Sequence, residues 1–198
     1  AKDRQNASVK MDKKCTLEGR YLVKDTNVEK YRKVGEFELS DEQIQILDVV
    51  CKNNIAILNG FAGSGKTYST KGIINMLKDN NKSFQLMSPT GRAAKRMSEV
   101  SGEEAKTIHR LLEVEWGDGD RQIFTRNLEN PLEADAVIVD ELSMVDTHLF
   151  ASLLNALPLG CRLIMVGDAD QLPPVGAGNV LQDIIVSGLL PTVALTEI

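Results

Sequence analysis

A glycine-rich segment at residues 60–67 has the sequence Gly-Phe-Ala-Gly-Ser-Gly-Lys-Thr, which suits it to bind phosphate groups. It fits the pattern G-x-x-x-x-G-K-T, in which glycines let backbone N–H groups turn toward an anion. Lys66 adds a positive charge for the β- and γ-phosphates, and Thr67 offers a hydroxyl ligand to Mg²⁺. The alternative, a glycine-rich turn with a chance lysine, leaves the position of Thr67 unexplained. The segment predicts a nucleotide site formed by Gly60, Ala62, Gly63, Ser64, Gly65, Lys66, Thr67 and Tyr68, although Tyr68 also suits a role in packing the helix that follows.

Two adjacent carboxylates, Asp140 and Glu141, follow the apolar run 137–139. In P-loop ATPases one such aspartate binds Mg²⁺, and a neighbouring acid can orient and deprotonate the attacking water. We therefore expect Asp140 to serve the metal together with Thr67, and Glu141 to serve the water. An acidic pair after a strand is also typical of a helix N-terminus, but the glycine-rich loop earlier in the chain favours the catalytic role.

A neutral amide, Gln171, follows the predicted strand 161–166, which contains the apolar run 163–166. An amide can accept a hydrogen bond from water and donate one to phosphate, so it can sense whether the γ-phosphate is present. Two prolines follow and stiffen the loop. The alternative is an ordinary proline-containing turn. With Lys66 and Glu141, Gln171 completes the predicted catalytic set.

These groups need a framework, and the chain alternates between short apolar runs and amphipathic segments. The pattern predicts strands at 55–59, 83–87, 136–140 and 161–166, and helices at 66–78, 91–99, 104–112, 146–156 and 178–186. The strands are apolar on both faces, which is typical of a parallel sheet sandwiched by helices. Ligands bind such sheets at the carboxyl ends of the strands, where the motifs lie. The predicted fold class is therefore α/β, a P-loop NTPase sheet.

Two segments stand apart from this alternation. Residues 1–37 are polar, with a short strand predicted at 16–23 and a short helix at 27–33, and form a predicted N-terminal appendage to a domain at 38–198. That domain opens with a helix whose N-cap is Ser40, since Gln43 three residues later completes a capping box. Residues 113–126 read as strand, glycine turn and strand, which predicts an inserted β-hairpin. A surface excursion without function is the alternative for the hairpin.

Composition limits the class of protein and the cellular compartment that we expect. The apolar fraction is 42% and the net charge is −5, so the chain is not a basic nucleic-acid coat protein. Residues 1–33 carry a local charge of +5, which suits either nucleic acid or a solvated tail. We expect no membrane partner, because no apolar run approaches the roughly 20 residues of a membrane span. The three scattered cysteines and the absence of an apolar signal core predict a cytoplasmic protein with reduced thiols.

With these residues in place, the chain resembles the first RecA-like motor domain of superfamily 1 DNA helicases. Within that group it resembles the RecD-like enzymes, the family of the exodeoxyribonuclease V alpha subunit. The resemblance spans about residues 38–198 and rests on blocks at 39–43, 60–67, 88–97, 107–112, 130–145 and 167–178. Tyr68 is a mild departure from the family, which usually has threonine or another small residue there.

The resemblance implies residue roles that spacing alone does not. Gln43 would read the adenine edge, so ATP would be the nucleotide. The single-stranded DNA path would be lined by Ser88, Pro89, Thr90, Arg92, Thr107 and His109. A solvated helix face is the alternative for Arg92, Lys95 and Arg96, and a buried capping role for His109. The hairpin 113–126 would be a pin that parts the duplex, with Trp116 or Phe124 as a stacking surface.

The implied activity is ATP hydrolysis with Mg²⁺, coupled to 5′-to-3′ movement on single-stranded DNA. The sequence stops where the family continues into an arginine-bearing block and a second RecA-like domain, so we expect this chain alone to be nearly inactive. Nuclease or helicase subunits are expected partners. One alternative is an ATP-gated DNA-binding subunit of a nuclease complex without unwinding of its own. A P-loop kinase is disfavoured, because the chain has no arginine-rich lid.

Overall fold

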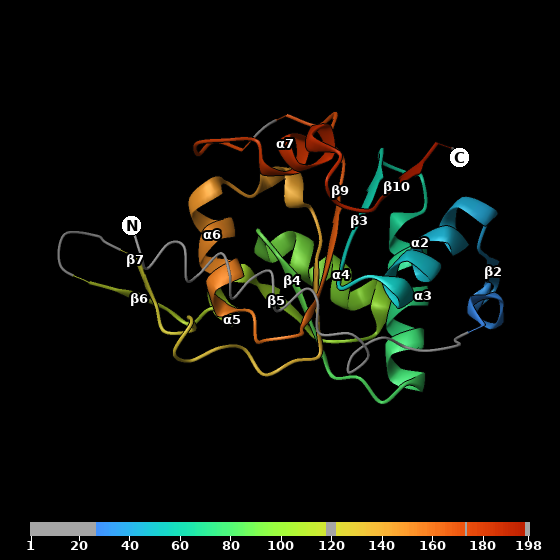
Figure 1. Cartoon of the computed structure of the whole chain (residues 1–198), viewed down its shortest axis with the longest axis horizontal. Coiled ribbons are helices and arrows are strands. Elements are labelled where there is room, and N and C mark those ends of the chain that lie inside the picture. Colours follow the sequence, from blue (N-terminus) through green and yellow to red (C-terminus); the bar gives the residue numbers. More distant parts are fainter. Residues whose placement is uncertain (1–26, 118–121, 173, 197–198) are drawn as a thin grey trace.

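A six-stranded parallel sheet forms the centre of the structure, a computed structural model that describes residues 27–117, 122–172 and 174–196 (Figure 1). Its strands, in order across the sheet, are β10 (Thr192–Leu195), β3 (Ile55–Gly60), β9 (Arg162–Gly167), β8 (Ala136–Val139), β4 (Phe84–Ser88) and β5 (Ala105–Thr107). Every neighbouring pair runs parallel, so all carboxyl ends meet at one edge. The predicted α/β class with a parallel sheet is confirmed.

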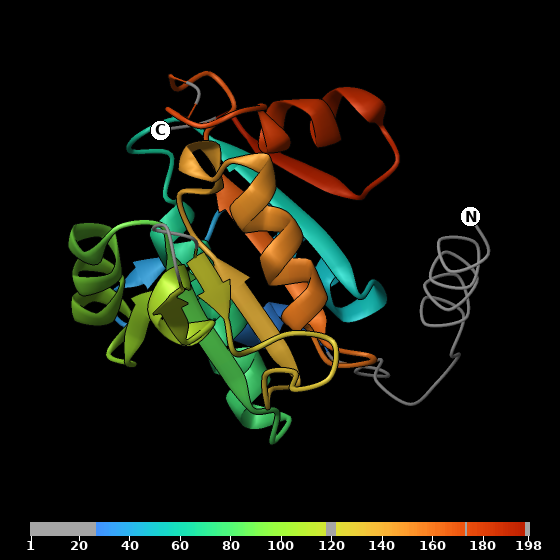
Figure 2. The ribbon, with the colours of Figure 1, turned by 90° about the vertical axis from the view of Figure 1, so that its left-hand side faces the viewer.

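Helices cover both faces of the sheet. One face carries α2 (Asp41–Lys52), α3 (Lys66–Asp79) and α4 (Gly91–Ser101); the other carries α5 (Ile108–Leu111), α6 (Thr147–Ala156) and α7 (Val180–Ser187). Figure 2 shows α6 in orange crossing in front of the strands. Successive strand residues point to opposite faces, so Leu58 belongs to the first core and Ile57 to the second. This double coverage explains why the strands are apolar throughout.

The predicted helix at 104–112 is wrong in its first half. Residues 105–107 form the edge strand β5, which pairs with β4 and sets Thr107 opposite Ser88. Only the single turn α5 follows, with the Thr107 hydroxyl accepting a hydrogen bond from the N–H of Arg110 at 3.2 Å. Pairing with a distant strand therefore overrides the local helical pattern. Strand β10, at the opposite edge of the sheet, was also not predicted.

The described part of the N-terminal segment is packed on the domain. It forms the 3₁₀ turn η1 (Val28–Tyr31) and the small antiparallel pair β1 (Lys33–Val34) and β2 (Phe37–Glu38). Tyr31 and Val34 are buried in the same core as α2 and α3, and the Arg32 guanidinium donates to the carbonyl of Leu39 at 2.8 Å. The capping box predicted at Ser40 is present. The strand predicted at 16–23 lies outside the described residues.

The inserted hairpin is confirmed by the antiparallel pairing of β6 (Val114–Trp116) with β7 (Gln122–Phe124). It projects from the end of the molecule that carries α5 (Figure 1). The Trp116 side chain is 66% exposed, so it is available for contact with another molecule. The glycine turn that joins the two strands lies outside the described residues.

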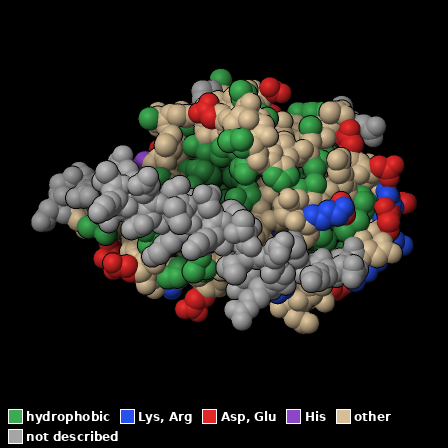
Figure 3. Space-filling view, viewed as in Figure 1, with side chains coloured by type: hydrophobic (Ala, Val, Ile, Leu, Met, Phe, Trp, Pro, Cys, Tyr) green, Lys and Arg blue, Asp and Glu red, His purple; other side chains and the backbone are tan. Residues whose placement is uncertain are grey.

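The surface carries exposed apolar side chains at Leu172 and at several positions between 174 and 189. Leu172, Val186 and Leu189 are all largely exposed, and Figure 3 shows hydrophobic side chains in the upper part of the molecule, where Figure 1 places α7. This stretch follows directly after Gln171. Among the described helices, none combines the length and the apolar character that crossing a membrane requires.

Candidate active site

The glycine-rich loop joins the buried strand β3 to helix α3. Gly63 and Gly65 have φ values of +92° and +83°, a backbone region that glycine enters without strain. Gly65 is the N-cap of α3 and supplies no side chain to cap its first turn; the N–H of Tyr68 donates to the carbonyl of Gly65 at 3.0 Å, which leaves the N–H groups of Lys66 and Thr67 for an anion. At Gly60 a Cβ atom would lie 2.5 Å from Oγ of Ser64, so the loop also needs glycine where it leaves the strand.

Lys66 is folded back onto its own loop. Its ammonium donates to the carbonyl of Gly60 and, at 2.9 Å, to that of Phe61. Burial lowers the pKa of Lys66, while Asp168, Asp140 and Glu141 oppose this shift by favouring its charge. The lysine therefore lies within the field of three carboxylates at the phosphate loop.

The two predicted acids lie at the carboxyl end of β8. The N–H of Glu141 donates to Oδ1 of Asp140 at 2.8 Å. Glu141 has φ +54° and ψ +40°, a left-handed conformation that costs a non-glycine residue about 1–3 kcal/mol and recurs at functional sites. Burial raises the pKa of both carboxyls; at Glu141 the charge of Asp140 adds to the shift.

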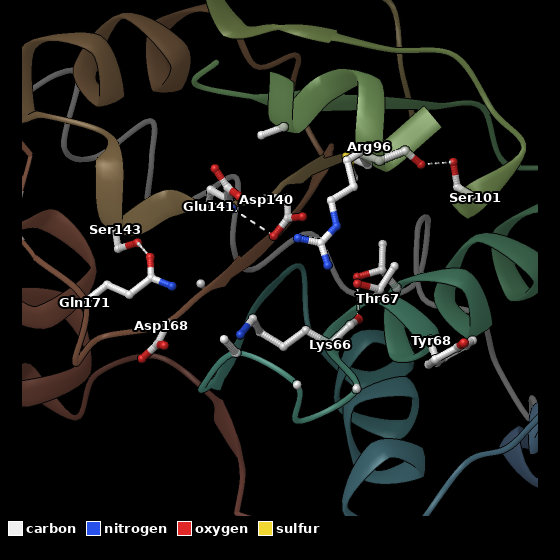
Figure 4. A pocket seen from close by; sticks show the side chains of 17 residues that line it. Lys66, Thr67, Tyr68, Arg96, Ser101, Asp140, Glu141, Ser143, Asp168 and Gln171 are labelled. Carbon is white, nitrogen blue, oxygen red and sulfur yellow. Dashed lines mark hydrogen bonds between the residues drawn. The ribbon is translucent and has the colours of Figure 1, made fainter. Parts of the chain in front are cut away.

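Asp140 and Thr67 line one cleft with Lys66 and Glu141 (Figure 4). Asp140 is half-buried and forms no salt bridge with any described residue, and the nearby charges of Lys66 and Arg96 offset only part of the effect of its burial. A carboxylate and a hydroxyl are hard oxygen donors, the type that Mg²⁺ takes while keeping several waters and phosphate oxygens. These residues therefore fit Mg²⁺.

Gln171 reaches the same cleft from the loop after β9. Its Oε1 accepts a hydrogen bond from Oγ of Ser143 at 3.3 Å, and its N–H donates to the carbonyl of Asp168 at 3.2 Å. The loop is tied to the strand next to it, because the N–H of Ala169 donates to Oδ1 of Asn59 at 2.9 Å. Gln171 is thereby linked to the segment that follows Glu141.

Among the side chains that line the cleft but were not assigned to it from sequence are Asp168, Ser143 and Arg96. Asp168 and Ser143 follow β9 and β8, so the signal that located Asp140 at a strand end was also present for them. Arg96 enters the cleft from α4, and Figure 4 shows its guanidinium pointing toward Asp140 and Thr67. From sequence, a solvated helix face was the alternative for Arg96, and no role in the nucleotide site was predicted for it.

Gln43 lies against the outside of the phosphate loop. Its Oε1 accepts from the N–H of Ser40 at 2.9 Å, and its Nε2 donates to the carbonyls of Ser64 and Gly65 at 3.4 and 3.3 Å. It borders a second cavity, which Phe37 and Tyr68 also line with ring centroids 4.1 Å apart. An aromatic wall beside a phosphate loop suits a flat base, and the adenine role of Gln43 stays a prediction.

The predicted DNA residues gather where β4 and β5 end side by side. Thr90 and Thr107 serve as N-caps of α4 and α5, Arg92 is exposed, and Pro89 is half-buried. The ring of His109 contacts that of Phe124, with centroids 5.9 Å apart, which links this edge to the hairpin. Ser88 is fully buried and its Oγ has no hydrogen-bond partner, so its side chain is not presented to a ligand outside. The DNA roles stay predictions.

This geometry can be set beside known proteins. Residues 43–177 match the AAA domain family. The chain belongs to this family. It is 41% identical over 160 residues to the ATP-dependent RecD2 DNA helicase of Deinococcus radiodurans, a match that covers 81% of this chain and 21% of the relative. It is 33% identical over 168 residues to the RecBCD enzyme subunit RecD of Mycobacterium tuberculosis, covering 73% of this chain and 28% of the relative.

A solved structure agrees with these relatives. The crystal structure of Bacteroides Pif1 bound to ssDNA matches 82% of this chain and 43% of its own, with a TM-score of 0.55 and 26% identity. The resemblance to RecD-like superfamily 1 motor domains is confirmed. The chain spans between a fifth and a third of the length of the two curated relatives.

Proposed function

We propose that this chain is an ATP-binding motor domain of a DNA helicase, hydrolysing ATP with Mg²⁺ and coupling the reaction to movement on single-stranded DNA. One observation carries the proposal. The phosphate loop, the Asp140–Glu141 pair and Gln171 line a single cleft at the carboxyl edge of the sheet. The strand ends next to it in the sheet, at Ser88 and Thr107, carry the predicted DNA residues.

Each residue has a defined part in the proposed hydrolysis. Bound Mg²⁺ would neutralise phosphate charge and hold the phosphate oxygens in place. Lys66 would exchange the carbonyls of Gly60 and Phe61 for β- and γ-phosphate oxygens. Glu141 would accept a proton from a water whose oxygen bonds to the γ-phosphorus as the bond to the β–γ bridging oxygen breaks. The left-handed backbone of Glu141 fixes where that carboxylate points.

Gln171 suits the role of reporting the γ-phosphate. Its Oε1 is held by Ser143, which leaves the amide NH₂ for phosphate or water in the cleft. Loss of the γ-phosphate would then change the contacts of a loop tied to both β3 and the segment after β8. Through these contacts, hydrolysis would change the loops beside the ends of β4 and β5, the edge of the sheet where the predicted DNA residues lie (the DNA edge).

We further propose that efficient turnover needs a second domain. An arginine contributed across the cleft between two motor domains typically raises phosphoryl transfer by about 10³–10⁵-fold. The relatives are several times longer than the matched segment, so unwinding is proposed for a protein of that length. Movement 5′ to 3′, repair or recombination, and a cytoplasmic location are parts of the same proposal.

A second candidate is an ATP-gated DNA-binding subunit of a nuclease complex. The name of the mycobacterial relative, a RecBCD enzyme subunit, favours it. A strand-separation assay with the full-length protein distinguishes the two, using duplexes with a 5′ or a 3′ tail and a Lys66→Ala control. Unwinding from the 5′ tail alone, lost in the variant, supports the motor. DNA-stimulated hydrolysis without unwinding from either tail supports the gated subunit. Absence of DNA-stimulated hydrolysis contradicts both.

A further inference from the structure

Arg96 and Lys95 are neighbours on α4, but of the two only Arg96 lines the nucleotide cleft. The buried residues of this helix are Ala93, Ala94 and Met97, which face the sheet and α3. Lys95 points outward, with its ammonium 4.0 Å from the carboxylate of Glu99. Arg96 instead borders the buried stripe and lines the nucleotide cleft. Arg96 is exposed like Lys95, and the space it is exposed to is the nucleotide cleft.

The charges of the cleft make this arginine significant. Its acidic lining residues are Asp140, Glu141 and Asp168, and its basic ones are Lys66 and Arg96. Arg96 thus supplies half of the positive side chains available to an anion. Without it, a triphosphate would meet three carboxylates with one lysine and its own metal ion as compensation.

The guanidinium of Arg96 is also uncommitted. Lys66 already donates to two loop carbonyls, whereas Arg96 forms no hydrogen bond or salt bridge with any residue that the structure describes. Its donors are directed across the cleft toward Asp140 and Thr67 (Figure 4). A planar fork of donors matches the oxygens of a phosphate.

We propose that Arg96 binds the terminal phosphate of the bound triphosphate from within the same domain. The inference rests on the function proposed above. The first turn of α3 and the glycine loop provide for the α- and β-phosphates. Arg96 approaches from α4, on the side of Asp140 and Glu141, where the bond to the γ-phosphate would be cleaved.

The position of Arg96 on α4 gives the contact a mechanical consequence. The same helix begins at the Thr90 cap and carries Arg92, one turn before Arg96. Thr90 and Arg92 both belong to the predicted DNA edge. Because a helix moves as a rigid element, a γ-phosphate that holds Arg96 also holds the first turn of α4, and its loss releases both.

Calorimetric titration of the 198-residue chain tests the contact without hydrolysis. Mg²⁺ with a non-hydrolysable ATP analogue is compared with Mg²⁺ and ADP, for the wild type and for Arg96→Ala, Arg96→Lys and Lys95→Ala. A lost hydrogen bond to a charged group weakens binding by about ten- to hundredfold. We expect Arg96→Ala to weaken the affinity for the triphosphate analogue by that factor and the affinity for ADP by less than about twofold. Arg96→Lys should lie between, and Lys95→Ala should match the wild type.

Three outcomes overturn the inference. Equal weakening of both nucleotides by Arg96→Ala means that Arg96 contributes only general charge, and no weakening means that it does not touch the ligand. If Arg96→Ala loses more affinity for a single-stranded oligonucleotide, measured without nucleotide, than for the ATP analogue, Arg96 belongs to the DNA edge instead. If the wild type binds neither nucleotide, the proposed function fails as well, which distinguishes that result from the other three.

Discussion

Replacing Gly65 with alanine measures how the phosphate loop is held. At φ +83° an added Cβ would lie 2.0 Å from Nε2 of Gln43. The left-handed conformation costs an L-residue about 1–2 kcal/mol. The methyl group also displaces the Gln43 amide, which is bonded to Ser40 and to the loop carbonyls, and each such bond contributes about 1 kcal/mol. We expect Gly65→Ala to lower the free energy of unfolding by about 2–4 kcal/mol.

Gly63→Ala is the matched control for this prediction. Its φ of +92° carries the same conformational cost, but no atom lies within 4 Å of the added Cβ, so only about 1–2 kcal/mol should be lost. Urea unfolding followed by circular dichroism measures both variants. Adding Gln43→Ala to Gly65→Ala removes the clash. The loss of unfolding free energy in the double variant should therefore be smaller than the sum of the two single losses by at least about 0.5 kcal/mol. Equal losses at the two glycines, with an additive double variant, would refute the reasoning.

Three further predictions follow from single side chains. Glu141→Gln should leave the affinity for the ATP analogue within about twofold and lower the hydrolysis rate by about 10²–10⁴-fold, measured by phosphate release from the full-length protein; an unchanged rate would exclude Glu141 as the base. Burial raises the pKa of Cys161 to about 12, so at pH 8 its thiol should alkylate about a thousandfold more slowly than a free cysteine, read residue by residue by mass spectrometry; equal rates would contradict its burial. Arg162 is 2% exposed, and its guanidinium donates to the carbonyls of Val50 and Cys51, at the end of α2, at 3.0 and 3.4 Å. Arg162→Ala should therefore lower the free energy of unfolding by about 2–4 kcal/mol in the same urea assay. A loss below about 0.5 kcal/mol would show that these hydrogen bonds are dispensable.

The parts of the site that were predictable from sequence are those whose chemistry is local. Residues 60–67 carry their function in consecutive positions, and Asp140 and Gln171 follow apolar runs that had to be strands of a covered sheet. In a parallel sheet all such strand ends meet at one edge, so local pattern and topology give the same answer. The structure brings these residues to one cleft, as that argument requires.

The features that escaped prediction depend on contacts between distant segments. Residues 105–107 become a strand because β4 offers an open edge, which no local signal reveals. Arg96 and Lys95 are neighbours in sequence and both are exposed, yet only Arg96 lines the cleft, a difference that depends on how α4 packs on α3. Ser88, expected on the DNA path, is buried because β4 lies inside the sheet.

Binding of an ATP analogue tests the central claim most directly. Calorimetric titration of the 198-residue chain with the magnesium complex of a non-hydrolysable ATP analogue is compared for the wild type and Lys66→Ala, with circular dichroism to confirm that both are folded. A cleft built for nucleotide predicts saturable one-site binding that weakens by at least about tenfold in the variant, because Lys66 supplies a charged hydrogen bond to phosphate. No saturable binding by the folded wild type, or equal affinity in the variant, would contradict the account.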